Sequence, residues 1–208
     1  SSDAEGLLVQ QARTTTELSR PEAELAVVTG ADGATVRLMR WGLVPSWARD
    51  TKIAYATINA RVETVAEKPA FRGAWRARRR ALVPATGWYE WKAVGTLKQP
   101  YYVSASDGNP QMLGALWERW LDPQGVELHS CAIITVPVRP ELAAVHDRMP
   151  LVLAPAQWAG WLDPKLPQVP AVLEAAALPY TFTTVARTVN SVRNDGPELV
   201  RPLFGLAQ

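Results

Sequence analysis

Short β-type runs without a regular alternation of strand and helix constrain the fold of this chain most strongly. Each run is rich in β-branched, aromatic or aliphatic residues and is bounded by Gly, Pro, Asn or Asp. The few helical patterns intermix with them irregularly, so the sequence predicts one α+β domain with a mostly antiparallel sheet. The expected strands are 24–30, 34–42, 80–92 as strand, turn and strand, 100–106, 111–120, 128–136 and 180–187.

The helical patterns are short. Residues 64–79 begin with Thr64 and Glu67, which fit a capping box, but Pro69 lies inside the pattern and is expected to break or kink it. Residues 154–162 predict a helix with two tryptophans on one face. The remaining expectations are a helical or irregular lead-in over 1–20, a loop over 43–50, a short helix, turn and strand over 139–153, and a short helix over 167–176.

Composition narrows the class of protein. The chain has 208 residues, 48% of them hydrophobic and 20% charged, which is typical of one globular domain over 1–208. Its single cysteine, Cys131, lies in an apolar run and excludes an internal disulfide framework, and with two histidines it also excludes a Cys/His zinc site. We expect a cytoplasmic protein with no metal, no cofactor, no secretory signal and no membrane span.

Charge is concentrated in one third of the chain. Residues 40–100 hold 12 Lys or Arg and 4 Asp or Glu, a net charge of +8, while the whole chain has a net charge of +2. A basic segment favours an anionic partner such as nucleic acid, although a solvated basic face is an equally good interpretation of the charge alone. Aromatic side chains could stack on unpaired bases here or fill the core. Five of the nine tryptophans lie in this segment: Trp41, Trp47, Trp75, Trp88 and Trp91.

Five polar residues are candidates for chemistry, each with a plainer alternative. Glu90 stands among aromatics and could serve as a general acid or base, or could form an exposed ion pair with an arginine. His146 could transfer protons, or could make a structural hydrogen bond to Asp147. Asn59 could hold a sugar hydroxyl or cap a turn. Arg61 and Arg72 could bind phosphates or pair with nearby glutamates.

Taken in order, several segments closely resemble signature blocks of the SRAP (SOS-response-associated peptidase) family of abasic-site processing proteins. The resemblance runs from about residue 34 to 203. The blocks are RWGLVPSWA, INARVET, the run 68–72, LVPATGWYEW, IITVPV, VHDRMP and the tail segments 189–190 and 194–199. The resemblance implies a barrel-like, mostly antiparallel sheet with short helices.

The resemblance also implies a function. Family members bind single-stranded DNA at abasic sites and form a covalent DNA–protein crosslink. Their nucleophile is a cysteine at position 2, whose α-amine and thiol form a thiazolidine with the aldehyde of the opened sugar. AP-lyase chemistry and self-processing that removes the N-terminal Met accompany this activity. The resemblance therefore predicts a DNA-repair enzyme that acts as a monomer on abasic single-stranded DNA.

Site residues are carried over position by position from the matching blocks. Asn59 of INAR, Glu90 of WYEW and His146 of VHDRMP are expected to be catalytic. The two titratable groups would handle protons during ring opening and imine formation, and Asn59 would hold the sugar and the cysteine. The residues expected to line the DNA channel are Trp41, Pro45, Trp47, Arg61, Arg72, Trp91 and Arg148.

The start of the chain departs from the family pattern. It reads Ser1-Ser2-Asp3-Ala4-Glu5 instead of Met-Cys-Gly-Arg, and the family's Asn-x-Ala-Pro-Thr-Gln block is absent. We therefore expect the N-terminal catalytic segment to be missing from this sequence. The alternatives are a non-catalytic single-stranded DNA-binding domain without the nucleophile, a Schiff-base enzyme using the amine of Ser1, a thiol-type autopeptidase, and a small-molecule hydrolase using Glu90 and His146.

Overall fold

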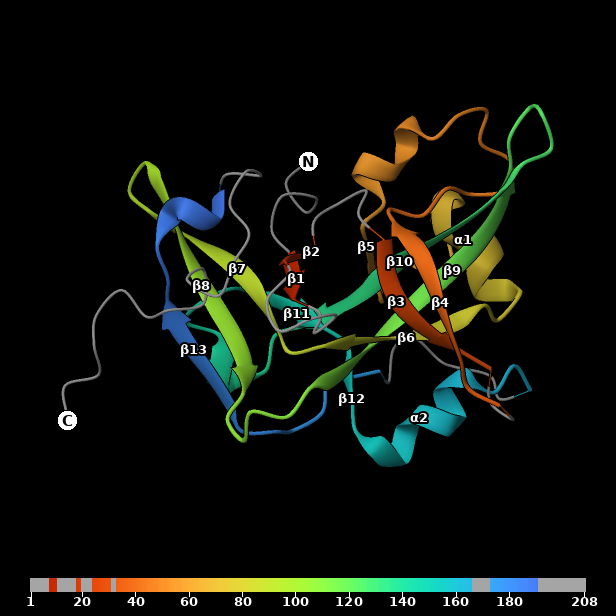
Figure 1. Cartoon of the computed structure of the whole chain (residues 1–208). Coiled ribbons are helices and arrows are strands. Elements are labelled where there is room, and N and C mark those ends of the chain that lie inside the picture. The colour runs from red at the N-terminus through yellow and green to blue at the C-terminus, as the bar shows by residue number, and fades with distance from the viewer. Residues whose placement is uncertain (1–7, 11–17, 20–23, 31–32, 166–172, 191–208) are drawn as a thin grey trace.

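The described residues form two β-sheets and two short α-helices, and both helices pack on strands of the larger sheet (Figure 1). The computed structural model describes residues 8–10, 18–19, 24–30, 33–165 and 173–190. The mixture of strands and short helices confirms the predicted α+β class.

The larger sheet closes into a five-stranded barrel in the order β10-β4-β3-β6-β9, because β9 also pairs with β10. Only the β4–β10 pairing is parallel, and the other four are antiparallel. The barrel-like, mostly antiparallel sheet is therefore confirmed. The barrel strands are β3 (Glu24–Thr29), β4 (Thr35–Trp41), β6 (Arg80–Ala85), β9 (Gln111–Leu121) and β10 (Glu127–Pro137).

Apolar side chains fill the barrel. Strand β3 alternates buried and less buried residues, as expected when one face of a strand looks into a core. Strand β10 is buried continuously from Ser130 to Val136, because other elements also cover its outer face. Fully buried members of the core include Leu25, Val27, Met39, Trp41, Leu113 and Ile133.

The second sheet is antiparallel, with the order β13-β8-β7-β1-β2. Only Thr86 separates β6 from β7, so the chain passes directly from the barrel into this sheet. Strand β7 therefore carries its residues to the junction of the two sheets. The strands are β1 (Leu8–Gln10), β2 (Leu18–Ser19), β7 (Gly87–Val94), β8 (Leu97–Ala105) and β13 (Tyr180–Thr184).

Three short strands extend the barrel. Strands β5 (Asn59–Arg61) and β11 (Arg148–Pro150) both pair with β10, and β12 (Val152–Leu153) pairs with β9. The β5–β10 pairing is parallel. Strand β10 thus brings together two segments that are far apart in the sequence, and both carry candidate site residues.

The helix predicted over 64–79 is shorter than expected. Helix α1 (Pro69–Arg76) begins with the proline itself, and residues 62–67 form turns instead. A proline fits the first helical position because its missing N–H would have no intrahelical partner there. The prediction of a start at Thr64 was therefore wrong. Helix α2 (Pro155–Leu162) confirms the other prediction, with Trp161 buried and Trp158 half-buried.

Two further expectations differ from the structure. Strands β1 and β2 replace the helical or irregular lead-in where it is described, because β1 completes its backbone hydrogen bonds along β7. The helix expected over 167–176 lies mostly outside the described residues, and 173–176 are not helical. Three 3-10 turns complete the description: η2 (Lys52–Ala56), η3 (Pro140–Leu142) and η5 (Arg187–Asn190). Across the described ranges, no helix is long and apolar enough to cross a membrane.

Candidate functional site

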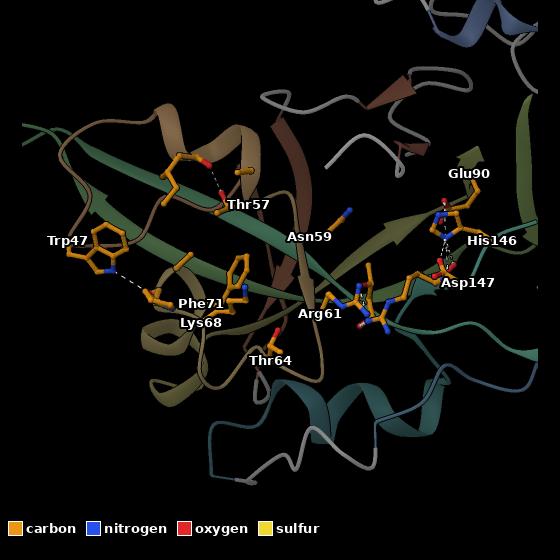
Figure 2. A pocket seen from close by; sticks show the side chains of 16 residues that line it. Trp47, Thr57, Asn59, Arg61, Thr64, Lys68, Phe71, Glu90, His146 and Asp147 are labelled. Carbon is orange, nitrogen blue, oxygen red and sulfur yellow. Dashed lines mark hydrogen bonds and ion pairs between the residues drawn. The ribbon is translucent and has the colours of Figure 1, made fainter. Parts of the chain in front are cut away.

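A cavity of about 540 Å³ lies where the barrel meets the second sheet (Figure 2). All three residues predicted to be catalytic line it, together with three of the seven predicted to bind DNA. The chain segments that form its wall come from η2, β5, the start of α1, β7, β10 and the connection that precedes β11. The lining residues are Trp47, Ile53, Ala56, Thr57, Asn59, Arg61, Thr64, Lys68, Pro69, Ala70, Phe71, Glu90, Thr135, His146, Asp147 and Arg148.

Strand β5 places two of these side chains. Its residues pair in parallel with β10, with Asn59 opposite Ile133 and Arg61 opposite Thr135. Because side chains alternate along a strand, Asn59 and Arg61 project on the same face while Ala60 is buried behind them. Both therefore point into the cavity from one strand, and the Arg61 side chain is 47% exposed.

Glu90 is a buried carboxyl at the end of the cavity that lies away from Trp47 (Figure 2). Its side chain is only 6% exposed, and its neighbours on β7 are Tyr89 and Trp91. Burial raises the pKa of Glu90 well above the usual range of a carboxyl, and the negative charge of Asp147 raises this pKa further. Glu90 is therefore a buried carboxyl rather than the exposed ion-pair partner of an arginine, and its burial favours the protonated form.

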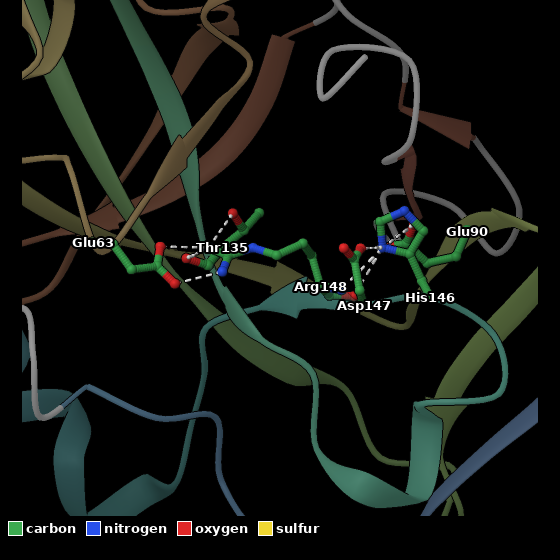
Figure 3. A network of polar contacts seen from close by, with 6 residues as sticks. All are labelled: Glu63, Glu90, Thr135, His146, Asp147 and Arg148. Atoms are coloured by element: carbon green, nitrogen blue, oxygen red, sulfur yellow. Dashed lines mark hydrogen bonds and ion pairs between the residues drawn. The ribbon is translucent and has the colours of Figure 1, made fainter. Parts of the chain in front are cut away.

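His146 lies beside this carboxyl (Figure 3). Its Nδ1 is 3.8 Å from Glu90 Oε2 and 3.2 Å from Asp147 Oδ1. The backbone N–H of Arg148 donates to the same Nδ1 over 3.0 Å. When Nδ1 accepts this bond, the proton of the neutral imidazole lies on Nε2. One ring nitrogen thus faces both a donor and two carboxyl groups, an arrangement suited to proton exchange.

Arg148 is fixed by a network of its own (Figure 3). Its two terminal nitrogens contact the two carboxylate oxygens of Glu63 at 2.5 and 2.8 Å. One of them also donates to the carbonyl of Thr135 over 2.9 Å. The hydrogen bonds from Arg148 lower the pKa of Glu63. Arg148 lines the cavity, but its guanidinium is largely occupied by Glu63 and Thr135.

The other residues predicted to bind DNA lie in different environments. Trp47 is 60% exposed at the cavity mouth, and Arg72 is exposed on α1 outside the cavity lining. Trp91 is half-buried against the ring of Tyr89. By contrast, Trp41 is fully buried and donates from its indole to the carbonyl of Ile58 over 2.9 Å.

Trp41 and Pro45 are therefore placed away from solvent. Pro45 is buried in the loop that follows β4, and neither residue lines the cavity. The local sequence shows two tryptophans in one motif, but Trp41 is the last residue of β4 and faces the core, whereas Trp47 lies in the loop after this strand and is exposed. The structure thus gives Trp41 a core position, for which the usual preference of tryptophan for burial is sufficient reason.

Several lining residues were not singled out in the sequence. Lys68 and Phe71 lie at the start of α1, Ile53 lies on η2, and Thr135 lies on β10. Lys68 and Phe71 belong to one of the segments that match the family's signature blocks, and Thr135 belongs to another, so the sequence could have indicated these three residues as part of the site. Ile53 lies in none of these segments, so nothing in the sequence indicated it. Within the described part of the chain, no three His, Cys, Asp or Glu side chains are grouped as a metal site would require.

Comparison with known proteins identifies close relatives. The family model described as SOS response associated peptidase (SRAP) matches residues 9–192. The abasic site processing protein YoqW of Bacillus subtilis is 38% identical over 177 residues, covering 81% of this chain and 78% of YoqW. YedK of Escherichia coli, which carries the same description, is 32% identical over 168 residues, covering 78% of this chain and 73% of YedK.

Relatives are also found in vertebrates and among solved structures. The abasic site processing protein HMCES of Gallus gallus is 33% identical over 190 residues, covering 79% of this chain and 56% of HMCES. The crystal structure of a protein from Bacteroides thetaiotaomicron superposes with a TM-score of 0.80 at 28% identity, covering 90% of this chain and 85% of that one.

Proposed function

This chain belongs to the SRAP family, and from that premise we propose that it binds single-stranded DNA at abasic sites and processes the lesion in the cavity. The observation that carries the proposal is the buried Glu90, whose pKa is raised by burial, beside His146 at the end of a cavity whose mouth is cationic and aromatic. An abasic site lacks a base, so its sugar can reach a depth that an intact nucleotide would not.

The two titratable groups divide the proton chemistry. Glu90, whose burial favours the protonated form, can donate its proton to the ring oxygen of the closed sugar. His146 can accept a proton from the hydroxyl on the anomeric carbon at Nε2 in the tautomer whose Nδ1 carries the proton and donates to Asp147 or to the carbonyl of Arg148. Breaking the bond between the ring oxygen and the anomeric carbon then leaves the aldehyde and a new hydroxyl. Glu90 gives up one proton and His146 gains one, so the pair returns to its starting state when a proton passes from His146 to Glu90 through one bridging water, since the 3.8 Å between them is too long for a direct hydrogen bond.

The remaining groups position the strand. The side chain of Asn59 projects from β5 towards the sugar, and Arg61 on the same face is 47% exposed and can meet a phosphate. The exposed indole of Trp47 offers a stacking surface to a neighbouring base at the mouth. Arg61, Asn59 and Trp47 would thus contact a phosphate, the sugar and a base, respectively. None of these contacts reads the identity of a base, so binding should not depend on the DNA sequence.

The covalent step that we propose needs an N-terminal cysteine. The α-amine of that residue adds to the aldehyde and loses water to give an imine, and the thiol then adds to the imine carbon. One aldehyde and one aminothiol thus give one thiazolidine and one water. AP-lyase chemistry would pass through the same imine, and removal of the initiator Met would expose the amine. We place this activity in the cytoplasm and in a single protomer.

Binding specificity tests the proposal. Fluorescence anisotropy would compare three labelled oligonucleotides of one sequence: a single strand with one abasic site, the undamaged single strand and the undamaged duplex. We expect the abasic strand to bind at least tenfold more tightly than the undamaged strand, and the duplex to bind most weakly. Equal affinity for the two single strands would support the alternative, a DNA-binding domain without chemistry, and would contradict the proposal.

A further inference from the structure

Helix α1 begins inside the cavity wall and leads away from it. Lys68, Pro69 and Phe71 line the cavity, and the indole N–H of Trp47 at the mouth donates to the carbonyl of Pro69 over 3.3 Å. This hydrogen bond therefore links the indole ring of Trp47 directly to the first residue of the helix. In Figure 2, Trp47 and Lys68 lie at one end of the cavity, and Glu90 and His146 lie at the other.

The two faces of α1 differ in character. Phe71 and Ala74 are buried, and the half-buried ring of Trp75 lies 6.3 Å from that of Trp161. The solvent-exposed side of the helix, beside the buried face, carries Lys68, Arg72 and Arg76, and all three are exposed. These three follow one another at intervals of four residues, which places them in one row along the helix.

The row spans a distance that suits a nucleic-acid backbone. Four helical residues rise about 6 Å, so Lys68, Arg72 and Arg76 cover about 12 Å in all. Successive cations therefore recur at a spacing close to that of phosphates in an extended single strand. Lys68 begins this row at the cavity mouth, so the row continues the cationic lining beyond the cavity.

No acidic group neutralises this row among the residues that the structure describes. Lys68, Arg72 and Arg76 take part in no ion pair there. The carboxylate beneath the helix belongs to Glu118 on β9, which is buried and already bound by Arg79 at 2.6 Å. The cations of the row are therefore available to an anionic partner.

We propose that Lys68, Arg72 and Arg76 form a track for the phosphates of one arm of the DNA strand as it leaves the cavity. This inference rests on the proposed function, and it adds the route of the strand. Charge complementarity and continuity with the cavity point to the same strand rather than to a second partner. Only one arm of the strand follows α1, because the helix starts from one end of the cavity.

Paired substitutions and oligonucleotides of different lengths test the track. The variant Arg72→Ala/Arg76→Ala removes two cations from exposed positions where alanine favours the helix, so we expect it to fold. The matched control, Lys92→Ala/Lys165→Ala, removes two exposed cations from the β7–β8 hairpin and from the segment after α2. Each protein would be titrated with abasic single strands that keep both arms, only the 5′ arm or only the 3′ arm.

The expected result is specific to one arm. With both arms present, the α1 variant should lose affinity on the order of tenfold, and its salt slope should become shallower by roughly 1.4, because two phosphate contacts are lost. The loss should persist with one single-armed strand and disappear with the other, while the control variant matches the wild type. A loss on both arms, a loss on neither, or an equal loss in the control would overturn the track. Failure of the wild type to bind any abasic strand would instead overturn the proposed function.

Discussion

At the scale of single residues, the proposed chemistry depends on Glu90 and His146, which lie side by side at one end of the cavity. Glu90 is buried among aromatics, which raises its pKa, while the side chain of the other carboxyl, Asp147, is 88% exposed. Two carboxyl groups within reach of one imidazole therefore play different parts, because their environments differ. Burying the Glu90 carboxyl costs stability, and in the proposed function this cost serves proton transfer.

This cost can be measured through the substitution Glu90→Gln. The pKa of Glu90 is raised in the folded state, so folding binds a proton and the wild type loses stability as pH rises from about 4.3, the unfolded value, through the folded pKa. Thermal unfolding should show equal stability of the variant and wild type near pH 4 and a higher melting temperature of the variant near pH 8. The exposed control Glu67→Gln should show no such difference. A variant that is less stable at pH 8 would contradict the burial argument.

Glu63 presents the opposite case. Its pKa is lowered by Arg148, so its contribution to stability is present above the unfolded value and is lost as pH falls through the folded pKa. We expect Glu63→Gln to reduce the free energy of unfolding by about 1–2 kcal/mol at pH 7, since Arg148 loses its partner while solvent screens part of the effect. Chemical denaturation at pH 7 and pH 3 measures this.

The matched control for Glu63 is Glu141→Gln, which breaks an exposed pair with Arg139 of 3.4 Å. An exposed ion pair contributes little to stability, so the control should leave the free energy of unfolding nearly unchanged. If both substitutions had the same small effect, the network of Glu63, Arg148 and Thr135 would not be a structural support of the site.

At the scale of elements, the close pairing of β7 with β8 holds Glu90 in place. Glu90 pairs with Tyr101, and near the start of the strand Gly87 lies against the ring of Tyr102. A Cβ atom at Gly87 would lie 2.3 Å from that ring. The absence of a side chain at this position therefore allows the close approach that sets the path of β7.

The substitution Gly87→Ala tests this constraint. The ring of Tyr102 would have to shift within a well-packed region, which typically costs about 1–3 kcal/mol. We expect denaturant unfolding to show this loss of stability. The proposed activity on abasic DNA should fall by more than the loss of stability alone would explain, because β7 carries Glu90. The control is Gly33→Ala, since a Cβ at Gly33 meets nothing within 4 Å. Wild-type stability of Gly87→Ala would show that β7 and β8 adapt freely.

The sequence predicts these elements unevenly. The runs that became β3, β4, β6, β7, β8, β9, β10 and β13 were predictable because alternating or continuous apolar residues mark strands. The start of α1 was not, because a capping-box pattern at Thr64 and a helix-starting proline at 69 predict different boundaries. Short strands such as β5 and β11 depend on pairing with β10, which local patterns do not contain.

The site was predictable only in part, for a related reason. Candidate residues could be named, but the sequence alone could not show that Glu63 binds Arg148, because 85 positions separate them. It likewise could not distinguish Trp41 from Trp47, since the two differ in whether the chain faces the barrel interior or solvent. Tertiary placement, rather than residue type, decides both outcomes.

At the scale of the whole molecule, the junction of two sheets concentrates positive charge at one cavity. The net charge of +8 in residues 40–100 contrasts with +2 for the whole chain. Arg61, Lys68 and Arg72 belong to this basic segment and lie in or beside the cavity mouth. The charge asymmetry of the sequence therefore corresponds to a cationic surface around the proposed site.

Salt dependence tests this surface as a unit. If these three cations and Arg76 of the proposed track each meet one phosphate, log K for a single strand should fall with log salt with a slope of about −2.8. Titrations between 50 and 300 mM salt would measure the slope, and Arg61→Ala should make it shallower by about 0.7. A slope near zero would show that affinity does not depend on phosphate contacts.

The central claim is that Glu90 and His146 open an abasic sugar for covalent capture, and a denaturing gel tests it most directly. The chain and a version starting with Met-Cys-Gly-Arg and carrying the Asn-x-Ala-Pro-Thr-Gln block would each be incubated with a single strand carrying one abasic site. The control strand would carry a tetrahydrofuran site, which cannot open to an aldehyde. We predict a heat-stable shifted band for the cysteine-containing version on the abasic strand only, formed at least 100-fold more slowly after Glu90→Gln. No band in either version, or an unchanged rate after Glu90→Gln, would contradict the account.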